Sequence, residues 1–144
     1  MAKTYNNLYP EIYSFENLHA AYLRARRGKR DRIEVQRFEL DLEGNLIQLQ
    51  NELIWGQYRT GVYRKFIVTE PKERIVAALP FRDRVVQHAI YNAVRPVFDA
   101  TFIDQSFACR VGKGTHAAAD YVQAAIRSSP PDSWVLQMDV RRFY

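Results

Sequence analysis

The sequence has only one cysteine, Cys109, among its 144 residues. A single thiol cannot form an internal disulfide, and without a second cysteine it cannot build a thiolate metal site. The chain also lacks an apolar segment after Met1 and any apolar run of about 18 residues, so neither secretion nor membrane insertion is indicated. We therefore expect a cytoplasmic protein without a membrane partner, in which Cys109 is a small core residue.

The chain has an ordinary globular composition and a positive net charge. Its hydrophobic fraction of 47% and charged fraction of 26% exclude a disordered or fibrous chain, and its length fits one domain with a real core. The net charge of +5 is compatible with a polyanionic partner, although such an excess is also common on ordinary surfaces. Most of the excess lies in residues 62–144, which contain twelve lysines and arginines against eight acidic residues.

Helical patterns fill the first 61 residues. Ser14 is a suitable N-cap for a helix over residues 15–25, and Gly28 follows where a left-handed residue often ends a helix. Apolar residues then recur at three- and four-residue steps, which predicts one longer helix over residues 32–53. Gly44 lies inside this pattern. A glycine costs about 1 kcal/mol relative to alanine in a helix interior, so a break there is compatible with the pattern.

A dense basic cluster lies between these two helical patterns. Six lysines and arginines fall within residues 24–32, opposed only by Asp31. Such a cluster can bind phosphates with salt-sensitive affinity. It can equally be a solvated surface whose cations complement the C-terminal end of a helix dipole. The sequence leaves both interpretations open.

A β-hairpin is predicted in the middle of the chain. Residues 62–69 are rich in β-branched and aromatic side chains, and an apolar run at 75–79 follows a Pro-containing break. Lys72 and Arg74 lie in or beside the turn, where two cations can cover a triphosphate. The alternative is an exposed hairpin whose charges provide solubility and protect its edges.

Two more helices are predicted after the hairpin. The first covers residues 81–97 and contains His88, which has no partner at metal-ligand spacing and is interpreted as a packing histidine. The second has Thr115 as its candidate N-cap and follows a glycine-rich segment, residues 106–114. Glycines there allow backbone N–H groups to approach an anion or a nucleic-acid backbone, although the segment does not match a P-loop.

A strand is predicted at residues 134–144, because apolar side chains alternate with Gln137 and Asp139. Asp139 would then be an acid beside a cleft, or else an ordinary carboxylate that caps a turn or pairs with Arg141 or Arg142. Since the chain stops inside this apolar strand, we expect it to be part of a longer unit.

Three blocks in this order and spacing resemble bacterial reverse transcriptases of the group II intron-like kind, including those of diversity-generating retroelements. The blocks are PKER at 71–74, LPFRDRVVQHAIYNAVRPVFDATFIDQSFACRVGKGTHAAA at 79–119 and VLQMDVRRFY at 135–144. The resemblance covers about residues 5–144 and is most specific from Tyr63 onward. It implies an α+β fold, namely the helix-rich fingers with a β-hairpin and the first strand of the palm from a truncated right-hand polymerase. Residues 1–61 would be the helical part of the fingers, 62–133 the fingers with the hairpin, and 134–144 the palm strand.

The resemblance also implies roles for particular residues. Lys72 and Arg74 match the residues that grip the triphosphate of the incoming nucleotide, and Arg84 matches a residue that braces the fold. A template-contact role falls on four residues of the glycine-rich segment: Arg110, Gly112, Lys113 and Gly114. Asp139 matches the first catalytic aspartate, with the Val140 carbonyl as a further metal ligand. Tyr144 matches the residue that screens the sugar 2′-hydroxyl.

The chemistry implied by the resemblance is RNA-directed DNA polymerisation. Two Mg²⁺ ions would activate the primer 3′-hydroxyl and hold the triphosphate of a dNTP, with Asp139 bridging both ions. The partners would be an RNA template, a DNA or RNA primer, the missing palm and thumb, and in some systems an accessory subunit. The second aspartate pair of the family lies outside this sequence, so we expect this chain alone to be inactive. The alternative is a non-catalytic RNA- or DNA-binding module derived from such an enzyme.

Overall fold

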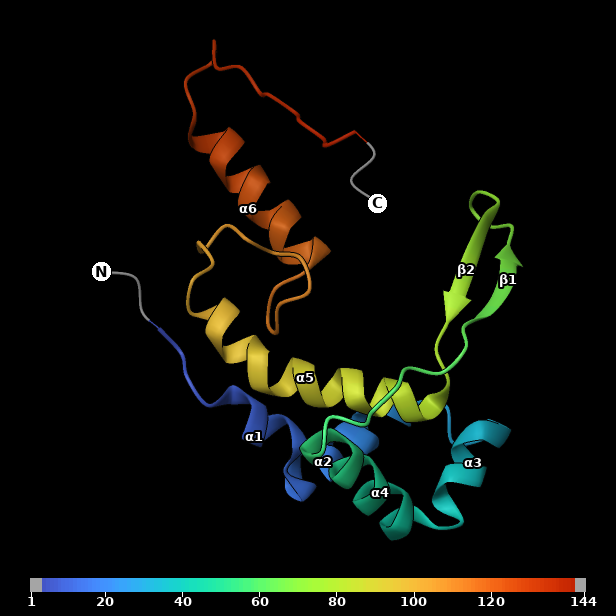
Figure 1. The fold of residues 1–144 in the computed structure, drawn as a ribbon. Helices are drawn as coiled ribbons and strands as arrows, with labels where there is room; N and C mark the ends of the chain where they lie inside the picture. Colours follow the sequence, from blue (N-terminus) through green and yellow to red (C-terminus); the bar gives the residue numbers. More distant parts are fainter. Residues whose placement is uncertain (1–3, 142–144) are drawn as a thin grey trace. The chain divides into compact units, whose positions relative to one another are not determined.

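The computed structural model describes residues 4–141, which form two compact units that divide between Thr101 and Phe102. Figure 1 shows the elements of both units. The first unit contains α1 (Leu8–Tyr13), α2 (Phe15–Ala25), α3 (Ile33–Glu39), α4 (Leu42–Ile54), β1 (Arg64–Val68), β2 (Arg74–Ala78) and α5 (Phe81–Asp99). The second unit contains α6 (Thr115–Ser128). The mixture of helices with one hairpin agrees with the predicted α+β class. The predicted functional divisions after residues 61 and 133 stay predictions.

Helix α2 begins as predicted. The Ser14 hydroxyl accepts a hydrogen bond from the Asn17 N–H at 3.2 Å, which satisfies one of the free donors of the first turn. Gly28 has a φ of +69°, the left-handed conformation expected of it. The helix itself ends at Ala25, as predicted, and the basic residues that follow are held by successive turn hydrogen bonds.

The single helix predicted over residues 32–53 is wrong, because the chain breaks at Leu40 and Asp41 to give α3 and α4. The Asp41 carboxylate accepts a hydrogen bond from the Gly44 N–H at 3.2 Å and so caps the start of α4. A new N-cap competes with continuation of the preceding helix. Gly44 therefore lies in the first turn of α4 and not at the break.

The core lies where α5 packs against the N-terminal helices, as Figure 1 shows for α1 and α2. Phe81, at the start of α5, packs edge-on against Phe38 with ring centroids 5.3 Å apart and against Tyr22 at 6.4 Å. The core consists of Leu18, Ala21, Tyr22, Ala25, Val35, Phe38, Leu46, Leu49, Leu53, Phe81, Val85, Val86 and Ala89. The predicted helix over 81–97 is confirmed, and it continues to Asp99.

The predicted hairpin is confirmed as an antiparallel pair in which Arg64 lies opposite Ala78 and Val68 lies opposite Arg74. Directly opposed residues of an antiparallel pair share one face, and alternate residues along each strand share it too. Arg74 therefore lies on the same face of the hairpin as Phe66 and Arg64. In Figure 1 the hairpin extends away from the helices at the start of α5.

In the second unit, helix α6 follows the glycine-rich segment as predicted, but Gly114 and not Thr115 is its N-cap. Cys109 is exposed, with a φ of +57°, so the prediction that it is a core residue is wrong. The expectation failed because a turn of the glycine-rich segment carries this residue to the surface. None of the helices formed by residues 4–141 is both long enough and apolar enough to cross a membrane.

The palm strand predicted over residues 134–144 is not formed in the described part of the chain, where residues 134–140 have no regular secondary structure. Their apolar side chains are exposed, to 98% for Trp134, and do not face a core. Alternation makes a strand only where a neighbouring strand supplies hydrogen bonds, and within residues 4–141 the two strands present pair with each other. The last three residues of the predicted strand lie outside the described residues.

Candidate nucleic-acid interface

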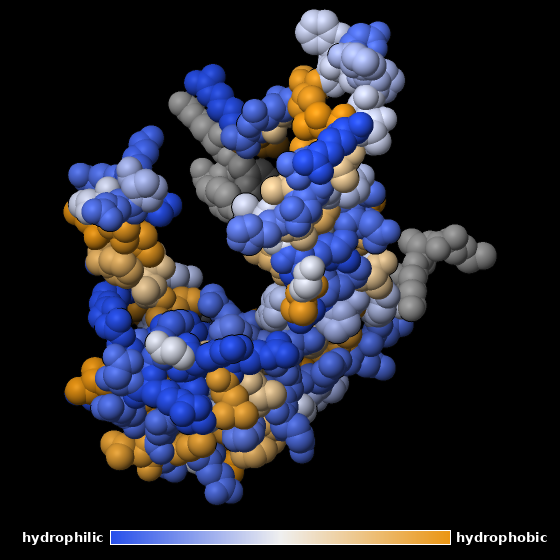
Figure 2. Space-filling model, turned by 180° about the vertical axis from the view of Figure 1, so that it is seen from behind, coloured by the Kyte–Doolittle hydropathy of each residue, from blue (hydrophilic) through white to orange (hydrophobic). Residues whose placement is uncertain are grey.

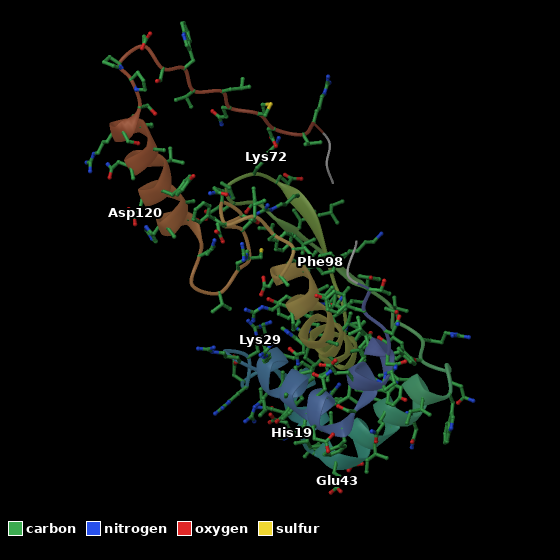
Figure 3. The ribbon with its side chains drawn as sticks, turned by 90° about the vertical axis from the view of Figure 1, so that its left-hand side faces the viewer. His19, Lys29, Glu43, Lys72, Phe98 and Asp120 are labelled. Carbon is green, nitrogen blue, oxygen red and sulfur yellow. The ribbon has the colours of Figure 1, made fainter. Side chains whose placement is uncertain are left out.

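The hairpin exposes cations at its tip. Lys72 lies in the turn between the strands and Arg74 is the first residue of β2, and both side chains are exposed. Figure 3 labels Lys72 at the tip and Lys29 beside the helices of the same unit. The two residues predicted to grip a triphosphate therefore lie together at the end of a projecting ribbon.

A second group of cations surrounds a hollow near the base of the hairpin, which we call the cationic cleft. It has a volume of about 570 Å³ and brings together Lys29 and Arg32 from the segment after α2, Arg64 and Lys65 from β1, and Arg84 from α5, with Glu34 as the one carboxylate. Phe66 and Ala78 supply its apolar wall. Figure 2 shows hydrophilic side chains gathered on the surface below the hairpin. Sequence reasoning found only Lys29 and Arg32, as part of a basic cluster, because the other cations come from distant segments.

Arg84 connects two helices at the edge of the cationic cleft, in agreement with the bracing role that the resemblance implied. Its guanidinium forms an ion pair with Glu34 of α3 and lies 5.5 Å from the centroid of the Phe81 ring. Arg84 therefore links the start of α3 to the start of α5, and its position is set by partners on both helices.

Asp83 anchors the segment that leads into the hairpin, a role that sequence reasoning missed. Its side chain is 2% exposed and accepts hydrogen bonds from the Tyr58 hydroxyl at 2.6 Å and from the Gly61 N–H at 2.9 Å. A Cβ at Gly61 would lie 2.9 Å from a carboxylate oxygen of Asp83, so this approach requires glycine. An acid in the first turn of a helix is too common to have revealed this contact.

Burial, followed by the hydrogen bond to Asp83, raises the pKa of Tyr58 to about 12. The hydroxyl therefore keeps its proton at neutral pH and remains a donor to the carboxylate. The tyrosine side of this contact therefore does not change over the physiological pH range.

Helix α5 carries His88 on a strongly positive face. Burial lowers the pKa of His88 below its ordinary value, and the nearby charges of Lys29, Arg24 and Arg84 lower it further. Lys29 and Arg84 also line the cationic cleft. Two of the cations that line the cleft therefore add to the effect of burial on the pKa of His88.

We predict that His88 titrates below about 6.5, the ordinary pKa of histidine. The unfolded state then binds more protons than the folded state, so the free energy of unfolding falls as pH drops through about 6.5 toward the folded pKa. NMR titration of the imidazole Cε1–H signal measures the pKa directly. His88→Gln should remove this part of the pH dependence, and an imidazole that titrates at or above 6.5 would contradict the prediction.

The predicted template residues lie in a loop of the second unit that is organised by its own cations. The Arg110 guanidinium donates to the carbonyl oxygens of Ile103 at 3.0 Å and Ser106 at 3.2 Å, while Lys113 donates to the Asp104 carbonyl. Gly112 and Gly114 have φ values of +74° and +138°, and a Cβ at either would meet no atom within 4 Å. The hydrogen bonds of the two cations fix the path of the loop backbone. The two glycines leave free space beside that backbone, where a side chain would otherwise project.

The predicted metal residues are not gathered into a cluster within the described part of the chain. Asp139 and Val140 are exposed, and Tyr144 lies outside the described residues. No group of three or more His, Cys, Asp or Glu side chains that could hold a metal ion occurs within residues 4–141. The roles assigned to these three residues stay predictions.

Two exposed clusters of cations, one at the tip of the hairpin and one near its base, are typical of proteins that bind polyanions. No protein-family model matches the chain. The chain is similar to nuclear intron maturase 2, mitochondrial, of Arabidopsis thaliana, with 29% identity over 101 residues. This similarity covers 59% of the chain but only 13% of the plant protein. It supports a reverse-transcriptase-like relationship at most and leaves catalysis untested.

Proposed function

We propose that the chain is the N-terminal fingers part of an RNA-directed DNA polymerase, in which the hairpin tip binds the triphosphate of the incoming dNTP. The observation that carries the proposal is the projecting hairpin with Lys72 and Arg74 exposed at its end. Ammonium and guanidinium groups form strong, charge-assisted hydrogen bonds with phosphate oxygens. The similarity to an intron maturase supports the same relationship.

The glycine-rich loop would contact the RNA template. Arg110 and Lys113 donate hydrogen bonds to the loop's own carbonyl groups, so their main contribution is to hold its backbone in shape. Gly112 and Gly114 then allow a nucleic-acid backbone to approach the main chain closely. A DNA or RNA primer would pair with that template in the complete protein.

Asp139 and the Val140 carbonyl would supply oxygen ligands for Mg²⁺, a hard cation that prefers such ligands. Bound Mg²⁺ would activate the primer 3′-hydroxyl and neutralise charge on the triphosphate. The remaining metal-binding carboxylates would come from the palm of the same polymerase. That polymerase would also contain a thumb. Tyr144 would exclude a ribose 2′-hydroxyl by steric contact, and an accessory subunit is a further candidate partner.

The test uses the protein encoded by the complete reading frame. Lys72→Ala and Arg74→Ala should each raise KM for the dNTP in Mg²⁺-dependent primer extension by about tenfold or more, because a hydrogen bond to a charged group contributes about 1.5–3 kcal/mol. Arg127→Ala removes an exposed cation from α6 and is the matched control, with unchanged KM. Asp139→Asn should abolish extension.

A wild-type protein that extends no primer would contradict the polymerase proposal. The second candidate function, a non-catalytic RNA-binding module, would then remain. It is favoured by one specific observation, the cationic cleft, which needs no metal or nucleotide to bind phosphates. Tight RNA binding without primer extension is its expected signature.

A further inference from the structure

Helices α1 and α4 lie in two stretches of the chain that are free of lysine and arginine. Residues 4–23 and 38–58 contain six acidic residues and neither of these cations, although the whole chain has a net charge of +5. Figure 3 labels Glu43 of α4 on the outside of the helices, away from Lys72 at the hairpin tip. The charge of these stretches is opposite to that of the hairpin tip and the cationic cleft, and it repels a polyanion such as RNA.

Hydrogen bonds join α1 to α4. The Tyr9 hydroxyl donates to the Leu53 carbonyl at 2.5 Å, and the Gln50 side-chain amide donates to the Tyr13 carbonyl at 3.0 Å. The rings of Tyr9 and Tyr13 also pack edge-on, with their centroids 5.3 Å apart. Both ends of α1 are thus tied to the last turns of α4, so the exposed side chains of the two helices belong to one surface.

An apolar stripe runs along this surface. Glu43, Ile47, Gln50 and Ile54 follow one another at steps of four, three and four residues, which places them on the same side of α4. Ile47 and Ile54 are 41% and 46% exposed, and Tyr9 on α1 is 49% exposed. The two isoleucines are about 10 Å apart along the helix axis, at the rise of an α-helix. A helix that packs alongside α4 repeats its own apolar side chains at the same seven-residue spacing.

Carboxylates border the stripe, and we call the set of Tyr9, Glu11, Glu43, Ile47 and Ile54 the acidic face. Glu11 and Glu43 are exposed and form no ion pair with any residue that the structure describes. Two other glutamates of the same stretches differ in this respect, because each is paired with an arginine. An apolar stripe beside unpaired carboxylates complements a partner whose apolar side chains are bordered by lysine and arginine.

We propose that the acidic face binds a basic amphipathic helix of a partner protein. The apolar side of that helix packs on Tyr9, Ile47 and Ile54, and its lysines and arginines lie opposite Glu11 and Glu43. RNA and a second copy of the acidic face are both disfavoured as occupants, because each carries the same sign of charge. The proposal requires neither dNTP nor RNA, so it does not depend on polymerase activity.

The test measures binding of a fluorescein-labelled peptide, KLKKLAKALKKLAKALK, to the purified chain by fluorescence anisotropy. As a helix, this peptide has leucines at seven-residue steps on one side and lysines on the other. Ile47→Ala/Ile54→Ala should raise its Kd about tenfold or more, because a few central anchors carry most of the binding energy of an interface. The matched control is Ile90→Ala/Ile126→Ala, which truncates two exposed isoleucines on other helices and should leave the Kd unchanged.

Charge reversal tests the carboxylates. Glu11→Lys/Glu43→Lys is compared with Asp120→Lys/Asp132→Lys, which has the same net charge but changes exposed positions of the second unit. The basic peptide should bind the acidic-face variant about tenfold more weakly than it binds the control. The same peptide with every lysine replaced by glutamate should bind the acidic-face variant more tightly than the control. Because this second result is a gain of affinity, a loss of folding cannot produce it.

The proposal is overturned if the basic peptide does not bind the wild-type chain, or if the acidic-face variants and their controls lose equal affinity. A short RNA should bind Ile47→Ala/Ile54→Ala as it binds the wild type, and a weaker affinity would assign the face to nucleic acid instead. Sedimentation velocity distinguishes a second copy, since a dimer that this double variant dissociates would show that the face binds its own copy. Circular dichroism verifies that every variant is folded.

Discussion

Replacement of Asp83 by alanine is expected to lower the free energy of unfolding by about 3–5 kcal/mol. The carboxylate is almost fully buried and accepts hydrogen bonds from the Tyr58 hydroxyl and the Gly61 N–H. Its removal deletes two charge-assisted hydrogen bonds and leaves both donors without this partner. The loss of stability should be largest in the segment before β1, where amide hydrogen exchange should become faster.

Urea denaturation followed by circular dichroism measures this change. Asp83→Asn is the matched variant, because it keeps the shape and one accepting oxygen and should cost clearly less than alanine. Tyr58→Phe removes one of the two hydrogen bonds and should fall between Asp83→Ala and the wild type. A loss below about 1 kcal/mol for Asp83→Ala would mean that the contact does not anchor the hairpin.

Replacement of Phe81 by alanine is expected to cost about 3–5 kcal/mol of stability, the usual range for deletion of a buried aromatic ring. Phe81 is 2% exposed and contacts the rings of Tyr22 and Phe38. It also lies beneath the guanidinium of Arg84. The substitution should therefore open a cavity between α2, α3 and α5 and loosen one wall of the cationic cleft.

Phe81→Leu keeps most of the buried volume and should lose about 1 kcal/mol. The free energies of unfolding of the two variants can be compared by chemical denaturation. An alanine variant as stable as the leucine variant would show that the aromatic cluster does not hold the three helices together.

Local signals predicted much of the fold. The helices α2 and α5 and the hairpin followed from an N-cap at Ser14, a 3.6-residue apolar period and a Pro-containing break between two apolar runs. These features act over a few residues, so the sequence alone contains them. The Asp41 cap was equally local, but the continuous apolar pattern on either side of it concealed the break.

The sequence did not predict features that depend on residues far apart in the chain. The alternation in residues 134–140 predicted a strand, yet pairing requires a second strand and none lies beside these residues in the described chain. The tip cations could be predicted because they are neighbours in sequence. The cationic cleft could not, because its walls come from separate segments of the chain, at residues 29–34, 64–66 and 78–84.

Both ends of the hairpin reach the first turn of α5. Strand β2 continues through Pro80 into Phe81, while Asp83 holds Gly61, just before β1. Both strands of the hairpin are therefore tied to the same turn of α5. By the reciprocity of linked equilibria, a ligand of the hairpin that bound with different affinity when the Asp83 contact was intact or broken would change the stability of that contact, and a variant of Asp83 would change the affinity for that ligand by the same free energy.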